Sequence, residues 1–97
     1  MNNIKKVVLH SLQGYRPELD ALVADWIREG IKYVGIVGVE ASRIEDAIDW
    51  LCIGDGSNAY FMLTASHGPD ESFDDAMLLA GQISAEEFGT KVRVVEF

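Results

Sequence analysis

Apolar and polar positions alternate along the chain in a way that predicts four strands and three helices. Continuous or alternating apolar runs, typical of strands, cover residues 4–10, 31–39, 58–65 and 91–97. Between these runs, apolar residues recur three and four positions apart, which is the spacing of one buried helix face. These helical patterns cover residues 16–30, 42–56 and 72–83.

Residues that favour helix ends support these boundaries. Gly30 follows the last apolar position of the first helix, where a residue without a side chain readily ends a helix. Ser42 with Glu45, and Ser72 with Asp75, have the spacing of a capping box, in which each side chain hydrogen-bonds the other residue's backbone. We therefore expect the second and third helices to begin at Ser42 and Ser72.

The order of the elements predicts an α/β fold in one domain, residues 1–97. A helix joins each pair of successive strands, and such crossovers are long enough to make the strands parallel. We therefore expect a four-stranded parallel sheet between helices (β-α-β-α-β-α-β), a three-layer sandwich that resembles half of a flavodoxin-like or Rossmann-like fold. We favour strand order 2-1-3-4, with 3-2-1-4 as the alternative.

The charge of the chain is acidic and unevenly distributed. Sixteen acidic and eight basic residues give a net charge of −8, and residues 40–90 hold eleven acids with Arg43 as their one base, a local net charge of −10. Nucleic-acid binding needs clustered Lys and Arg, so this surface disfavours it. A solvated acidic surface or a basic protein partner fits the charge.

Cysteine usage and the N-terminal residues bear on the cellular compartment. Cys52 is the only cysteine, so no disulfide can form within the chain, and the CxxC patterns of redox and zinc sites are absent. Three apolar residues separate Lys6 from His10, a stretch too short for a signal peptide or a membrane span. We expect a cytoplasmic protein that does not associate with membranes.

The carboxyl ends of the strands are where an open parallel sheet binds ligands. The residues expected on this rim are His10, Ser11, Glu40, Ser66, His67 and Asp70. In strand order 2-1-3-4 the loops after the first and third strands are neighbours. Both histidines of the chain would then face one ligand.

Three interpretations of these histidines stay open. With Asp70 or Glu71 they could hold zinc or iron, although no H-x-x-x-H or H-x-H spacing supports a metal site. His10, at a strand end, could act as an acid–base group or accept phosphate. In the third interpretation Asp70, Glu71 and Ser72 only cap a helix. The sequence contains no complete catalytic constellation, and we expect no cofactor and no metal.

Trp50, Ile53 and Leu78 are apolar but lie off the buried stripes of their helices. Such side chains, exposed among acids, indicate a contact surface, and they would form one patch if both helices flank the same face of the sheet. We therefore interpret the chain as a protein-binding or regulatory module without catalytic activity, with a partner that could be basic, and as a two-fold homodimer. The alternative is a phosphotransfer or metal-dependent site that uses His10 and His67.

Two resemblances bear on these hypotheses. The stretch "VVLHSLQG", which contains His10, resembles the IIA domain of mannose-type sugar phosphotransferase systems, where a histidine near the end of the first strand accepts phosphate. The stretch "EDAIDWL", together with the H-x-x-[DE]-E/S pattern that begins at His67, is similar to an uncharacterised family of small bacterial α/β proteins. The first resemblance implies phosphotransfer at His10, and the second implies no particular activity.

Overall fold

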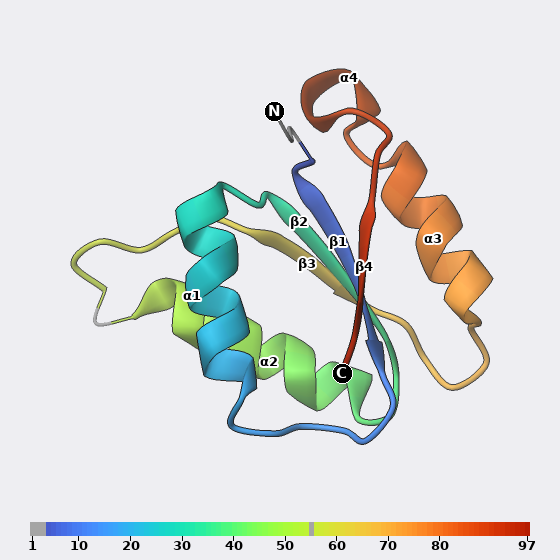
Figure 1. Cartoon of the computed structure of the whole chain (residues 1–97), viewed down its shortest axis with the longest axis horizontal. Coiled ribbons are helices and arrows are strands. Elements are labelled where there is room, and N and C mark those ends of the chain that lie inside the picture. Colours follow the sequence, from blue (N-terminus) through green and yellow to red (C-terminus); the bar gives the residue numbers. More distant parts are fainter. Residues whose placement is uncertain (1–3, 55) are drawn as a thin grey trace.

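The described chain alternates strands and helices in the predicted order and adds one short helix (Figure 1). The structure is a computed structural model that describes residues 4–54 and 56–97, so residues 1–3 of the predicted domain and Asp55 of the predicted second helix lie outside the described residues. The elements are β1 (Lys6–Ser11), α1 (Leu19–Glu29), β2 (Tyr33–Gly38), α2 (Ala41–Ile53), β3 (Leu63–Ser66), α3 (Phe73–Gln82), α4 (Ala85–Phe88) and β4 (Arg93–Glu96). None of the described helices combines the length and the apolar character needed to cross a membrane.

All four strands are parallel, and their order in the sheet is β3-β2-β1-β4. The favoured order 2-1-3-4 is therefore wrong, and the alternative 3-2-1-4 is observed. β1 and β2 are buried along nearly their whole length, as central strands need, whereas every residue of β3 is half-buried. Thr64 and Ser66 of β3 also carry hydroxyls that hydrogen-bond to α2, so this strand suits an edge of the sheet.

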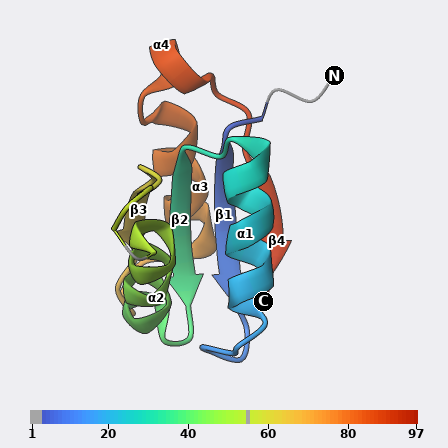
Figure 2. The ribbon, with the colours of Figure 1, turned by 90° about the vertical axis from the view of Figure 1, so that its left-hand side faces the viewer.

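Helices cover both faces of the sheet. Figure 2 shows α1 and α2 side by side in front of the strands, with α3 behind them. Two successive crossovers in one direction, from β1 to β2 to β3, put α1 and α2 on the same face, and the return crossover to β4 puts α3 on the other. As a consequence, α2 and α3 do not flank the same face.

The alternation of side chains along the strands divides the core into two parts. On one side of the sheet, Val7 packs with the apolar faces of α1 and α2, which include Trp26 and Ile48. On the other side, Val8 packs with α3, which contributes small residues such as Ala80. Each face of the sheet therefore has its own apolar cover, which fixes the register of all four strands.

Two of the predicted helix ends are confirmed. Gly30 ends α1 in the left-handed conformation, with φ of 79°. The Oγ of Ser72 accepts a hydrogen bond from the Asp75 N–H, and the Asp75 carboxylate accepts one from the Ser72 N–H. The capping box that begins α3 is therefore complete.

The predicted capping box at Ser42 and Glu45 is wrong. Helix α2 begins one residue earlier, at Ala41, and its N-cap residue Glu40 makes no side-chain capping bond. The carboxylate of Glu45 instead accepts a hydrogen bond from the Ser66 hydroxyl, at 2.8 Å. A hydroxyl on the adjacent strand thus competes successfully with the helix backbone for this side chain.

Candidate functional site

A cavity of about 350 Å³ lies at the carboxyl ends of β2 and β3. It is lined by Gly38, Glu40, Ala41, Ser42, Ser66, His67, Gly68 and Pro69. These residues belong to two turns, one between β2 and α2 and the other between β3 and α3. The structure thus brings together three residues of the predicted rim, Glu40, Ser66 and His67.

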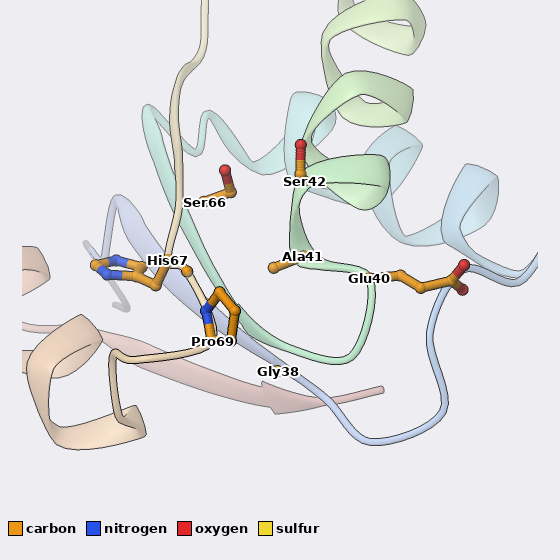
Figure 3. Close-up of a pocket in the computed structure, with 8 residues that line it drawn as sticks. Gly38, Glu40, Ala41, Ser42, Ser66, His67 and Pro69 are labelled. Carbon is orange, nitrogen blue, oxygen red and sulfur yellow. The ribbon is translucent and has the colours of Figure 1, made fainter.

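The ionisable side chains of this cavity turn away from it. Figure 3 shows the Glu40 carboxylate and the His67 ring pointing to opposite sides, away from the space between Ser42 and Ser66. The cavity is also lined by the hydroxyl-bearing Ser42 and Ser66, and the Ser66 hydroxyl donates to Glu45. Neither the His67 ring nor the Glu40 carboxylate therefore lies beside the Ser66 hydroxyl as a base (Figure 3).

Glu40 joins the turn after β2 to the loop after β1. Its Oε1 accepts a hydrogen bond from the Tyr15 N–H at 3.0 Å, and its Oε2 pairs with Arg43 at 3.2 Å. The backbone hydrogen bond from Tyr15 and the bond from Arg43 lower the pKa of the Glu40 carboxyl. The Glu40 carboxylate is therefore ionised at neutral pH and links the turn after β2 to the loop after β1.

Ser11 and Asp70, which were also expected on the rim, lie outside the cavity. Ser11 is buried, and its Oγ accepts a hydrogen bond from the Gly14 N–H at 3.1 Å, which closes the turn after β1. Asp70 is exposed in the turn before α3.

His67 is held inside the protein by an acid. Its side chain is only 4% exposed, and its Nδ1 lies 2.9 Å from the Glu71 Oε2. The other Glu71 oxygen accepts a hydrogen bond from the Gly68 N–H, and these two bonds lower the pKa of Glu71. The Nε2 of His67 is buried without a hydrogen-bond partner among the described residues.

The two histidines share one face of the sheet but do not meet. His10 pairs in register with Val37 of β2, and the His67 N–H donates to the carbonyl of Ile36, so β2 lies between them. Two strand spacings separate their backbones by about 10 Å. The ring of His10 instead lies 5.2 Å from the ring of Phe73 on α3. Strand order 3-2-1-4 is the reason that the expected juxtaposition is not formed.

A metal site would need several ligands at one place. Within residues 4–54 and 56–97, no three side chains of His, Cys, Asp or Glu lie close enough together to hold a metal ion. The hydrogen-bonded pair of His67 and Glu71 supplies only two such groups.

The residues expected at an interface are exposed but fall into two separate places. Trp50 is 72% exposed and Ile53 is 47% exposed, both on α2, whereas Leu78 is 63% exposed on α3. Because α2 and α3 cover opposite faces of the sheet, the single patch expected from the sequence is not formed.

A second cavity, of about 300 Å³, lies between the end of α2 and the segment before β3. It is lined by Asp49, Cys52, Ile53, Tyr60, Phe61 and Met62. We call it the α2–β3 groove. The sequence pattern placed Phe61 in a buried strand, but β3 begins two residues later and Phe61 is 76% exposed.

Asp49 lines the α2–β3 groove and, together with Glu45, approaches one hydroxyl of β3. The Thr64 hydroxyl lies 3.0 Å from Glu45 Oε2 and 2.9 Å from Asp49 Oδ1, so two carboxylates converge on one hydroxyl. Burial, aided by the charge of Asp49, raises the pKa of the Cys52 thiol in the groove wall. The thiol of Cys52 is thus neutral at pH 7, and the groove combines this neutral, largely apolar wall with the acidic side chain of Asp49.

Comparison with known proteins gives one match. The family model of DUF7684, described as a domain of unknown function, covers residues 3–95. No curated protein and no solved structure matches the chain.

Proposed function

The chain belongs to the DUF7684 family, whose function is unknown, and we propose from its surfaces that it is a non-catalytic module that binds another protein. The observation that carries the proposal is the α2–β3 groove, whose lining includes the exposed Phe61, together with the exposed Trp50 on α2, the helix that forms one wall of the groove. Large aromatic side chains are enriched in protein interfaces, and exposed apolar groups that gather in one place mark interaction sites.

The charge of the chain supports a basic partner. Residues 40–90, which contain both α2 and β3, carry a local net charge of −10. Opposite charge on a partner would speed the encounter and exclude acidic competitors. A lone buried thiol at Cys52 suits a reducing compartment, so we place the module in the cytoplasm.

The experiment that tests this proposal compares proteins retained by the immobilised chain and by two variants. The double variant Trp50→Ser/Phe61→Ser removes both exposed aromatic groups, and Leu78→Ser is the matched control on the other side of the sheet. We expect a basic protein to be retained by the wild type and by Leu78→Ser and to be lost from the double variant. Equal retention by all three chains would contradict the proposal, as would an enzymatic turnover that His10→Ala or His67→Ala abolishes.

A further inference from the structure

The outer edge of β3 offers backbone hydrogen-bonding groups that pair with no other described residue. β3 is the first strand in the order β3-β2-β1-β4 and, within residues 4–54 and 56–97, pairs only with β2. The Leu63 N–H donates to the Lys32 carbonyl just before β2, and the His67 N–H donates to the Ile36 carbonyl of β2. In a parallel ladder the alternate residues Thr64 and Ser66 therefore direct their N–H and C=O groups outward. An extended chain that lies along this edge could pair with both residues.

The opposite edge of the sheet, formed by β4, carries charged side chains that discourage pairing with another chain, and β3 has none. β4 carries Arg93, which pairs with Glu29 at 2.7 Å, and Glu96 near its end. Charged side chains on an edge strand discourage pairing with another chain. The four residues of β3 are Leu63, Thr64, Ala65 and Ser66, and none of them is charged.

We propose that the β3 edge binds an extended, lysine- or arginine-bearing segment of a partner protein, which adds to the sheet as a fifth strand. An apolar side chain of that segment occupies the α2–β3 groove beside Ile53 and Phe61. This inference rests on the proposed function and assigns the place and the chemistry of the contact.

Charge complementarity selects a basic segment over a second copy of this chain. Glu45 and Asp49 lie beside Thr64, and Glu45 also accepts from Ser66, so two carboxylates flank the edge along its short length. A Lys or Arg side chain on the added strand would meet them at hydrogen-bonding distance. If two copies paired through β3, four carboxylates would face one another on chains that each carry a net charge of −8.

The probe is a synthetic peptide, acetyl-LTKTKTL-amide, whose pattern is the same in both directions and therefore suits parallel or antiparallel pairing. Its leucines and lysines share one face of a strand. We expect it to bind and to shift the amide resonances of Thr64 and Ser66. The charge-inverted peptide LTETETL should bind at least about tenfold more weakly.

Backbone pairing is tested with two methylated forms of the peptide. One form carries N-methyl groups on the lysine and leucine amides, and the other carries them on the threonine amides. A strand pairs through only one of its two edges, so one form should lose binding and the other should keep it. Equal binding by both forms, or equal binding of LTETETL, would overturn the proposal, and so would a lack of any binding at millimolar peptide.

Proline variants test whether the peptide binds along β3. Thr64→Pro removes an outward N–H, a position where an edge strand tolerates proline, and should weaken binding at least about tenfold. Val94→Pro is the matched control, because Val94 is exposed and its N–H faces outward on the other edge. If Thr64→Pro does not fold, the amide shifts of Thr64 and Ser66 in the wild type still locate the strand contact, and Phe61→Ser tests the groove separately.

Two outcomes separate this inference from the proposed function. A protein partner whose binding needs Trp50 and Phe61 but tolerates Thr64→Pro would overturn the fifth strand and leave the proposed function standing. A wild-type dimer that Thr64→Pro converts to monomer would show that a second copy occupies the edge, which also overturns the inference.

Discussion

His67 and Glu71 form a hydrogen-bonded pair across the turn that joins β3 to α3. Nδ1 of His67 lies 2.9 Å from Oε2 of Glu71, while the other carboxylate oxygen accepts the Gly68 N–H. The imidazole is buried and the carboxylate is half-exposed, so the pair ties the surface turn to the core. His67 takes no part in the predicted helix cap, but through this pair it has a structural role at the turn.

The pair predicts how stability depends on pH. The hydrogen bonds from His67 and Gly68 hold the pKa of folded Glu71 below its ordinary value of 4.5. A depressed folded pKa contributes stability that is fully present above pH 4.5 and is lost as pH falls through the folded pKa. We expect wild type to be more stable than Glu71→Ala at pH 6 and the difference to shrink as pH falls below 4.5 and through the folded pKa, as measured by urea unfolding.

Two variants control this prediction. His67→Leu keeps the buried volume but removes Nδ1, so the pKa of Glu71 should rise toward 4.5 in a carboxyl NMR titration. Asp70→Ala removes the neighbouring exposed acid and should not reproduce the pH dependence of Glu71→Ala. An unchanged Glu71 pKa in His67→Leu would mean that the imidazole does not stabilise the carboxylate.

The two serines with the same sequence spacing should differ in their effect on stability. Ser72 caps α3, so Ser72→Ala should lower the free energy of unfolding by about 1 kcal/mol. Ser42 lies one residue inside α2 and caps nothing, so Ser42→Ala should change it by less than about 0.5 kcal/mol. Urea unfolding of both variants measures the difference, and equal losses would contradict the assigned helix starts.

The sequence predicts the elements well because their pattern is local. Helix periodicity, Gly30 and the Ser72 capping box each depend on residues within one or two turns of each other. The strand order depends on non-local contacts. The hydroxyls of Thr64 and Ser66 were the available signal, because polar residues on a strand disfavour a central position.

The candidate site was only partly predictable for the same reason. The carboxyl-end rule correctly brings Glu40, Ser66 and His67 to one cavity. It does not say where their side chains point, and Glu40 and His67 are drawn away by Tyr15 and Glu71. The α2–β3 groove was missed because an apolar run does not reveal which of its members lies before the strand begins.

Self-association remains a prediction from the sequence. Leu78 and Leu79 are exposed on α3, on the face of the sheet opposite the α2–β3 groove. We expect light scattering to give a dimer mass in physiological salt, where repulsion between chains of charge −8 is screened. Leu78→Asp should give a monomer and Trp50→Ala should remain a dimer. A monomeric wild type at high concentration would contradict the prediction.

Variants of Lys6 test whether a buried charge stabilises this fold. Its side chain is fully buried against α3, and Nζ donates to the Ala80 carbonyl at 2.7 Å. Burial lowers the pKa of Lys6 below its ordinary 10.5, which means that the folded protein disfavours the charged form. We expect Lys6→Met to be as stable as wild type at pH 7, or more stable by about 1 kcal/mol.

The pH dependence of stability and a second variant test whether burial of the Lys6 charge causes the difference between wild type and Lys6→Met. Between the folded pKa of Lys6 and 10.5 the unfolded chain binds more protons, so wild-type stability rises with pH in that window and any advantage of Lys6→Met shrinks. Lys6→Ala should be less stable than Lys6→Met by about 2 kcal/mol, because it leaves a cavity beneath α3. If Lys6→Met loses as much stability as Lys6→Ala, then the hydrogen bond to Ala80 outweighs the cost of burying the ammonium group, and the charge itself holds α3 on the sheet.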